Sequence, residues 1–320
     1  SSIIRLSHLP AETTDGHKIS VRANIEFLEE VATAKDHGAE GIGLYRTEYH
    51  YLRAQGLPTE DELFEDYREV AELIAPNPVT IRTLDLGGDR FSSEISWTKE
   101  TNPALGLRAI RFCLQQPKMF RSQLRAILRA STYGNIQVMF PMISGLQELL
   151  DSRRMLKEMM AELDQEGVTY DRNIKVGLMI EVPSAVTVAD ILAKHADFFS
   201  IGTNDLIQYA LAIDRVNEHV AFMYQPFHPA ILRMILQVIK AAKQAGIKVA
   251  LCGEMAGDPL CTSVLLAMGI DELSLNAGGI PMIKKMTRSL SLDQAKTDLR
   301  KIMKLDTAAQ VREFIVQKMQ

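Results

Sequence analysis

Charged side chains follow directly on apolar, strand-like runs at four widely separated places in the sequence. Two are arginines, Arg46 in GLYRTE and Arg82 in IRTLD, and two are acids, Glu181 after KVGLMI and Asp205 after FFSIGTN. Arginine binds carboxylate and phosphate groups through a planar, permanently charged fork. Carboxylates, completed by other oxygens, are the ligands of typical Mg²⁺ sites. These residue types therefore indicate a site for a small anion and a metal ion.

Each pair also has an ordinary structural explanation. The arginines could be halves of core ion pairs with Glu48 or Asp85, because buried arginines are nearly always paired. The acids could be N-caps, with Asp205 capping a helix that starts at Leu206. We favour the metal interpretation mainly because both acids would fall at the same level of a barrel. An ionised carboxylate after a strongly apolar run is also costly unless a cation compensates it.

Asn204 and Cys252 extend the same pattern. Asn204 is a natural hydrogen-bond donor to phosphate but also a common turn residue. Cys252 follows the run KVAL, and a thiol with an ordinary pKa of about 8.5 can donate a proton to a carbanion-like carbon. A small buried cysteine without a chemical role is the alternative. Cys113 and Cys261 lie within helical patterns, and we expect them to be packing residues.

The spacing of these side chains predicts the fold that positions them. From Asn24 to Asn276 the strand ends recur about every 36 residues, enough for a strand, a helix and two short loops. A parallel barrel gathers the C-terminal ends of its strands around one mouth. We therefore predict a single (β/α)8 TIM barrel over residues 1–320. The strand-end residues are Asn24, Arg46, Arg82, Pro141, Glu181, Asn204, Asp205, Cys252 and Asn276.

Helical patterns fill the intervals between the strands. Thr59 and Glu62 form a capping-box signature at the start of one helix, and Gly38 is a good end for the helix over 25–37. Another helix is predicted over 185–195. The tail from 293 to 320 is helical with no strand after it, and it should pack on the outside of the barrel or on a partner.

A long segment after the third barrel strand, from Gly87 to Cys113, exceeds what a connecting loop needs. Long loops on barrels usually carry function. Arg90, Arg108 and Arg111 could bring positive charge over the mouth, although Arg90 could equally be an ordinary surface residue.

Composition excludes several other classes of protein. The formal net charge is −4 and no long basic run is present, so we expect no nucleic-acid partner. Three cysteines without CxxC spacing indicate neither a disulfide framework nor a structural zinc site, and a reducing cytoplasm is the expected location. The start lacks an apolar signal-like region and no uncharged stretch approaches the roughly 20 residues that span a bilayer, so we expect no membrane insertion. None of the seven histidines has the context of a phosphoryl-carrying histidine.

Taken in order, the motifs resemble the C-terminal phosphoenolpyruvate-binding barrel of the Enzyme I family, the phosphoenolpyruvate-protein phosphotransferases that start the bacterial phosphotransferase system. GEMAGDP and HPAIL look closer to the nitrogen-related branch. The resemblance covers Gly41 to Pro259. No segment of this sequence resembles the N-terminal histidine domain of the family, and the loop reads GGDRFSS where many relatives have GGDKP. The matching blocks are GIGLYRTEYHYL, TIRTLDLGGDR, NPALGLRAIRFCL, MFPMIS, GLMIEVPSAV, FFSIGTNDLIQYALAIDR, FHPAIL and LCGEMAGDP.

The resemblance implies an anion site made mainly of arginines. Arg46, Arg82 and Arg215 would hold the phosphate and carboxylate groups of phosphoenolpyruvate, with Arg108 or Arg111 in support from the long loop.

It also implies the remaining chemistry. Asn204 would contact the phosphate, Glu181 and Asp205 would bind Mg²⁺, and Cys252 would donate a proton to C3 of the enolate. The phosphoryl group would pass to a histidine on a separate domain and then to a phosphocarrier protein similar to HPr, with release of pyruvate. We also expect a homodimer, in part because an apolar stretch around Phe222 has no evident role in a barrel.

Other functions fit the same residues. One is the barrel of a pyruvate phosphate dikinase or phosphoenolpyruvate synthase, whose motifs overlap heavily. Another is a module without catalysis that binds phosphoenolpyruvate, dimerises and senses the metabolite. A metal-dependent aldol lyase would use a similar acid pair but would not require Cys252.

Overall fold

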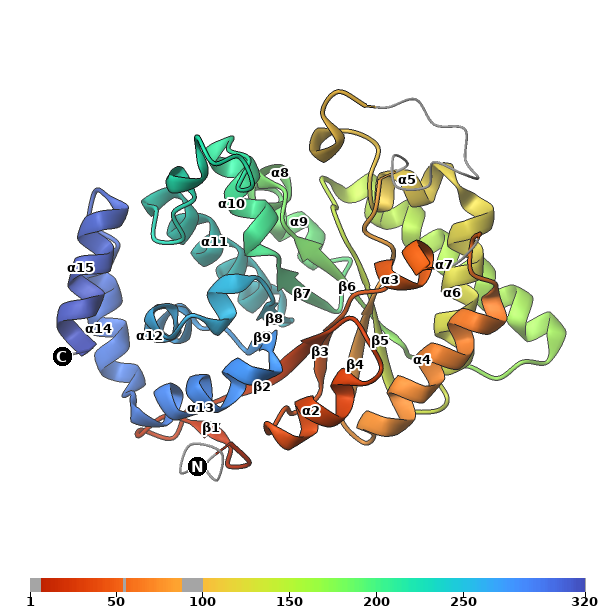
Figure 1. Ribbon diagram of the computed structural model, residues 1–320, viewed down its shortest axis with the longest axis horizontal. Coiled ribbons are helices and arrows are strands. Elements are labelled where there is room, and N and C mark those ends of the chain that lie inside the picture. The colour runs from red at the N-terminus through yellow and green to blue at the C-terminus, as the bar shows by residue number, and fades with distance from the viewer. Residues whose placement is uncertain (1–6, 54–55, 88–99, 320) are drawn as a thin grey trace.

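Eight parallel strands close into a barrel because β2 is hydrogen-bonded to β3 on one side and to β9 on the other (Figure 1). The computed structural model describes residues 7–53, 56–87 and 100–319. Within this part of the chain β1 is a short antiparallel addition to β2. The predicted TIM barrel is therefore confirmed. The strands are β1 Ala11–Glu12, β2 Lys18–Ile25, β3 Ile42–Tyr45, β4 Pro78–Arg82, β5 Asn135–Phe140, β6 Lys175–Ile180, β7 Phe198–Ile201, β8 Lys248–Leu251 and β9 Glu272–Asn276.

Helices surround the barrel and cover the outer faces of its strands (Figure 1). Strand residues are buried on both sides, as expected for a parallel sheet with helices outside and packed side chains inside. The α-helices are α2 Glu30–Asp36, α3 Glu48–Arg53, α4 Glu60–Ile74, α5 Ile110–Gln115, α6 Pro117–Ala130, α7 Leu146–Glu166, α8 Pro183–Thr187, α9 Ala189–Ala193, α10 Thr203–Leu211, α11 Pro229–Ala245, α12 Pro259–Met268, α13 Ile280–Ser289, α14 Leu292–Ile302 and α15 Ala308–Met319.

The helix-end signals in the sequence correspond to real ends. Thr59 caps α4, and its side chain and that of Glu62 form the reciprocal hydrogen bonds of a capping box. Gly38 follows α2 with φ +82, and a Cβ there would lie 2.1 Å from a backbone oxygen, so this close turn requires glycine. Both predictions are confirmed.

Three predicted helix boundaries are wrong. The helix expected over 25–37 begins only at Glu30, because β2 continues to Ile25. The helix expected over 185–195 is divided into α8 and α9, because Val188 leaves helical backbone angles between them. The helix expected to start at Leu206 begins at Thr203.

The C-terminal helices α14 and α15 pack against α12 on the outside of the barrel, as predicted. The long loop follows β4, and residues 88–99, Arg90 among them, lie outside the described residues. The described end of this loop is joined to its start, since Ala109 N donates to Leu86 O and Gly87 pairs with Arg108. Among the described helices, none has both the length and the apolar character needed to cross a bilayer.

Candidate active site

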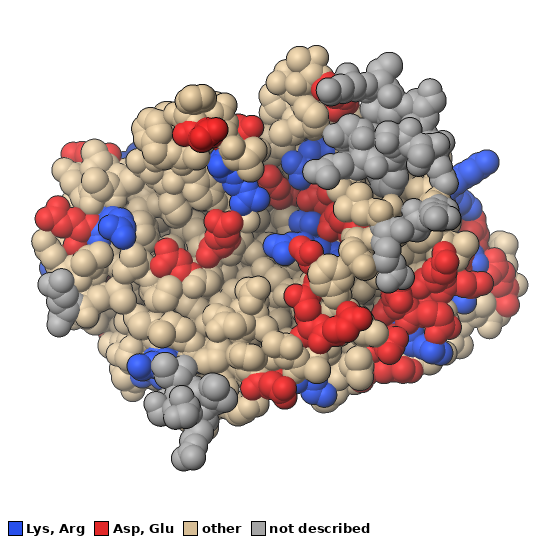
Figure 2. Space-filling model, viewed as in Figure 1, with Lys and Arg blue, Asp and Glu red and all other residues tan. Residues whose placement is uncertain are grey.

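The C-terminal ends of the strands surround a cavity of about 1660 Å³. Figure 2 shows it as a hollow in which basic and acidic side chains lie close together. A small apolar cluster from β3, β5, β6 and the end of β8 includes Leu44, Met179 and Cys252, which form part of the cavity wall. The cavity also contains most of the predicted strand-end residues, although not Pro141. Those that line it are Asn24, Arg46, Arg82, Glu181, Asn204, Asp205, Cys252 and Asn276, together with Arg108 and Arg215.

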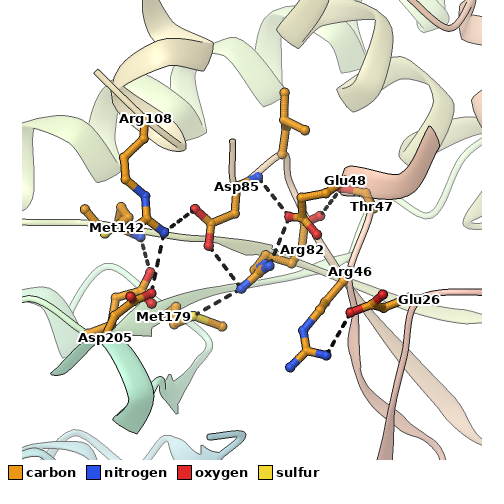
Figure 3. A network of polar contacts seen from close by, with 12 residues as sticks. Glu26, Arg46, Thr47, Glu48, Arg82, Asp85, Arg108, Met142, Met179 and Asp205 are labelled. Carbon is orange, nitrogen blue, oxygen red and sulfur yellow. Dashed lines mark hydrogen bonds and ion pairs between the residues drawn. The ribbon is translucent and has the colours of Figure 1, made fainter. Parts of the chain in front are cut away.

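Arg82 is the most deeply buried arginine of the cavity, with a side chain 10% exposed. Its guanidinium lies 3.0 Å from Glu48 and 3.2 Å from Asp85 (Figure 3). The two carboxylates proposed as ion-pair partners are therefore both partners of Arg82. The buried Nε of Arg82 nevertheless has no hydrogen-bond acceptor among the described residues. Because a buried donor without an acceptor is costly, this atom suits an anionic ligand.

Three carboxylates converge beside Arg82. Asp85, Glu181 and Asp205 each offer an oxygen, and these oxygens all lie within 4.8 Å of one another. Glu181 is 1% exposed, and burial, followed by the charges of Asp205 and Asp85, raises its pKa well above the ordinary value. Burial opposes ionisation of Asp85 as well, but Arg82 and Arg108 lower its pKa. A set of oxygen donors in which like charges are forced together fits a hard divalent cation such as Mg²⁺.

Local backbone geometry supports this acid cluster. Met142, just after β5, has φ +58, and its N–H donates to Glu181 Oε1 at 2.6 Å. A positive φ in a residue other than glycine is strained and is often found at functional sites. Asp205 lies in the first turn of α10, whose N-cap residue is Gly202. The proposed N-cap role of Asp205 is therefore wrong.

Arg108 joins the acid cluster from the long loop. Its Nη2 lies 2.7 Å from Asp85 and 3.5 Å from Asp205, and its Nη1 donates to the hydroxyl of Tyr209. Arg111 points elsewhere: its guanidinium donates to the carbonyls of Leu105 and Gly106, and it does not line the cavity. Of the two supporting arginines that the sequence offered, the structure brings only Arg108 to the site.

The other predicted anion-binding residues lie nearer the surface. Arg46 pairs with Glu26 at 3.2 Å, and its side chain is 35% exposed. This partner differs from the Glu48 or Asp85 suggested by sequence proximity. Arg215, which is exposed, pairs with Glu254 at 3.3 Å. The side-chain oxygen of Asn204 accepts a hydrogen bond from Glu254 N at 2.8 Å.

Cys252 follows β8 at the wall of the cavity and is 3% exposed. Burial raises the pKa of its thiol to about 11, so the thiol carries a proton at neutral pH. The side chain of Asn24 donates to Cys252 O at 3.0 Å and fixes the backbone there. Cys113 and Cys261 are buried in the main core within α5 and α12, as expected for packing residues.

Sequence reasoning missed two participants. Asp85 was considered only as an ion-pair partner, although it completes the acid cluster. Tyr209 was not considered, although its hydroxyl accepts from Arg108 and donates to Ala104 O. Asp85 follows β4 in the segment TLDLGG, so its position after a strand was a usable signal. No comparable signal marks Tyr209.

Comparison with known proteins agrees with this architecture. A solved citrate lyase from Burkholderia xenovorans aligns with 94% of this chain and 92% of its own, with a TM-score of 0.54 and 16% sequence identity, which shows a shared fold. A phosphoenolpyruvate-protein phosphotransferase from Priestia megaterium is 48% identical over 303 residues, or 95% of this chain and 53% of that protein. One from Haemophilus influenzae is 45% identical over 315 residues, or 98% of this chain and 55% of that protein. The chain thus spans about half the length of these curated relatives. The family model "PEP-utilising enzyme, PEP-binding domain" matches residues 2–292, and the chain therefore belongs to the phosphoenolpyruvate-binding domains of the PEP-utilising enzymes.

Proposed function

We propose that the barrel binds phosphoenolpyruvate together with Mg²⁺. The phosphoryl group of phosphoenolpyruvate then passes to a histidine on a separate domain, and pyruvate is released. The observation that carries this proposal is one cavity in which a triad of carboxylates meets Arg82 and Arg108. The names of the curated relatives favour a phosphotransferase over a pyruvate phosphate dikinase or a lyase. The family description supports phosphoenolpyruvate as the ligand.

The arginines in this proposal bind and orient the substrate. Arg46 and Arg215 have guanidinium groups near the surface, each paired with one partly exposed carboxylate, so an incoming anion can compete for them. Arg82 is held rigidly by Glu48 and Asp85 and retains an unused Nε donor. A prearranged set of cations stabilises the charge that spreads over a phosphoryl group in transit.

Glu181, Asp205 and Asp85 are the residues that would hold Mg²⁺. The bound ion would supply charge neutralisation at the phosphate and enolate oxygens. Asp85 and Asp205 are also held by Arg108, so this arginine couples the position of the acids to that of the long loop.

The reaction balances when the acceptor histidine of the separate domain and one proton from solvent are counted with the groups of this cavity. The bond between phosphorus and the enol oxygen breaks as phosphorus bonds to the acceptor histidine nitrogen, and the electron pair remains on the enolate. The thiol of Cys252 gives its proton to C3, which yields pyruvate, and the thiolate then takes a proton from solvent. Because burial raises the pKa of Cys252 to about 11, the protonated donor form dominates before the reaction.

We also propose the partners that this reaction requires. The acceptor histidine belongs to a phosphohistidine domain that passes the group to a phosphocarrier protein similar to HPr. The three cysteines of the chain are unpaired, which suits a reducing compartment such as the cytoplasm. A homodimer would cover the exposed Phe222 and Met223. Tyr224, the next residue, instead reaches toward the cavity, since its hydroxyl lies 3.4 Å from the cavity residue Asn204.

Calorimetric titration with phosphoenolpyruvate tests the central claim. We expect binding in Mg²⁺ and little or none in EDTA, with a matching rise in melting temperature, since a ligand that binds the folded state stabilises it. Equal binding with and without Mg²⁺ would overturn the metal assignment. No binding in Mg²⁺ would overturn the proposed function.

A further inference from the structure

A buried glutamine lies behind the cavity and not in its wall. Gln123 is on α6, is 1% exposed, and does not line the cavity. Its Oε1 accepts a hydrogen bond from Leu84 N at 2.9 Å. Its Nε2 donates to Thr47 Oγ1 and to the hydroxyl of Tyr67, each at 3.1 Å. Both ends of this amide are therefore engaged with groups on other elements.

The backbone segments that Gln123 contacts are the two that carry much of the site. Thr47 lies between Arg46 and Glu48 after β3, and Leu84 lies between Arg82 and Asp85 after β4. Thr47 also donates to Arg82 O at 2.9 Å, so the two segments are joined directly. Figure 3 shows Thr47 and Glu48 side by side, with Glu48 directed at Arg82. Gln123 thus ties both loops to one helix.

These loops need such a support because they lie beyond the strands. β3 ends at Tyr45 and β4 ends at Arg82, so the N–H of Leu84 has no place in the sheet ladder. Leu84 is fully buried, and water cannot replace the missing partner. A buried N–H must be paired within the protein, and Gln123 supplies the acceptor. The same side chain fixes the hydroxyl of Thr47, which sets the distance between the two loops.

Glu48 completes the connection from this support to the chemistry. Its carboxylate accepts from Arg82 Nη2 and from Asp85 N, both at 3.0 Å. A shift of Thr47 would move the adjoining Glu48, and with it the guanidinium of Arg82 and the carboxylate of Asp85. Sites of this kind depend on supporting groups that hold the contact residues within about 0.5 Å.

We propose that Gln123 is a positioning residue for the anion and metal site, acting through Thr47 and Leu84 on Arg82 and Asp85. This inference rests on the proposed function, because its effect is read as affinity for phosphoenolpyruvate in Mg²⁺. Gln123 touches neither ligand in this assignment.

The test compares Gln123→Met with a matched control, Ser131→Ala. Methionine keeps the length of the side chain and removes all three hydrogen bonds. Ser131, just past the end of the same helix, is also buried and accepts from Asp171 N at 2.8 Å. Its loss removes the side-chain acceptor of the N–H of Asp171, a half-buried residue that does not line the cavity. Misplacement by about 1 Å can reduce function a hundredfold, so we expect affinity to fall at least about tenfold for Gln123→Met and to be unchanged for Ser131→Ala.

A second variant covers the case in which Gln123→Met does not fold. Gln123→Glu keeps an acceptor for Leu84 N but, when ionised, cannot donate to Thr47 or Tyr67. Burial raises the pKa of a carboxyl group, so lowering the pH returns a donor O–H. We expect the affinity of Gln123→Glu, relative to the parent at each pH, to recover as the pH falls.

The outcomes separate the two levels of inference. If the parent protein binds no phosphoenolpyruvate in Mg²⁺, the proposed function fails and the role of Gln123 fails with it. If the parent binds and Gln123→Met binds equally well, or weakens only as much as Ser131→Ala, the positioning role alone is overturned. The positioning role is also overturned if the affinity of Gln123→Glu, relative to that of the parent, does not change with pH.

Discussion

Replacement of Glu181 by glutamine should stabilise the metal-free protein while removing its response to Mg²⁺. The buried carboxylate of Glu181 lies against those of Asp85 and Asp205, and burial and these charges raise its pKa. Glutamine has the same shape, can still accept from Met142 N, and can donate to Asp205. It therefore keeps the structural contact and removes the repulsion, while lacking the charge that a hard cation requires.

The size of the gain follows from the separation of the charges. Two full charges at 4.8 Å, the upper limit of the separations in this cluster, repel by about 3.5 kcal/mol at an effective dielectric constant of about 20. Arg82 and Arg108 offset part of this repulsion, and partial protonation of Glu181 limits it further. We expect Glu181→Gln to raise the free energy of unfolding in EDTA by about 1–2 kcal/mol at neutral pH.

The pH dependence of the free energy of unfolding provides an independent test of the direction of this effect. Because the folded-state pKa of Glu181 is raised above its ordinary value of 4.5, the folded protein binds more protons than the unfolded chain between these two values. The stability of the parent contributed by this group is therefore present below pH 4.5 and is lost as the pH rises through the folded-state pKa. The gain in stability of Glu181→Gln over the parent should therefore increase as the pH rises through this range, and it should vanish below pH 4.5.

Urea denaturation at a series of pH values, in EDTA and in Mg²⁺, measures these quantities. Glu272→Gln is the control, because Glu272 is a half-buried carboxylate whose pKa is also raised by burial but which pairs with Arg22 at 2.9 Å. Its replacement leaves Arg22 without a counter-charge and should destabilise. If Glu181→Gln destabilises the metal-free protein at every pH, the charge of Glu181 stabilises the fold without a metal and the metal reasoning is wrong.

Three further predictions concern substrate, proton transfer and assembly. Arg46→Lys keeps the charge but loses the fork, so affinity for phosphoenolpyruvate in a calorimetric titration should fall with little loss of stability, because the side chain of Arg46 is 35% exposed; unchanged affinity would contradict its role in binding. Arg82→Ala should lower both the affinity and, by about 3–5 kcal/mol, the free energy of unfolding, because Glu48 and Asp85 lose this buried partner. Cys252→Ala should retain binding but slow pyruvate formation by about 10² to 10⁴, followed in deuterated water with a histidine domain supplied in trans; pyruvate formation at the parent rate would make Cys252 a packing residue. Light scattering at micromolar concentration should give the mass of a dimer, and Phe222→Asp should lower it; a monomeric parent would contradict the dimer.

The barrel could be predicted from sequence because its signals are local. Each strand is a short apolar run, each helix has its own periodicity, and the recurrence of about 36 residues counts the units. Boundaries were less certain because they depend on tertiary contacts. For example, α10 begins at Thr203, with only Gly202 between it and the end of β7, and not at Leu206 as the sequence suggested.

The site was predictable to the level of strand ends but not of side-chain partners. Because Arg82, Glu181 and Asp205 each follow a strand, the sequence predicted that they lie at one mouth of the barrel, whatever the path of the loops. The choice between Arg108 and Arg111 depended on the path of the long loop, which has no repeating pattern. Glu26 as the partner of Arg46 was equally hidden, because the two residues follow neighbouring strands and are 20 positions apart.

The charges of the cavity explain why an anion and a cation should be bound together. Arg82 and Arg108 pair with Asp85, and Arg108 also lies 3.5 Å from Asp205, whereas Glu181 lies against Asp205 and is forced toward its protonated form. A divalent cation alone would relieve the acids but would leave the buried Nε of Arg82 without an acceptor. An anion alone would satisfy Arg82 but would face three carboxylates within the same small volume. If both bind as proposed, the two together satisfy both sets of groups, and by thermodynamic linkage each would then raise the affinity for the other by the same factor.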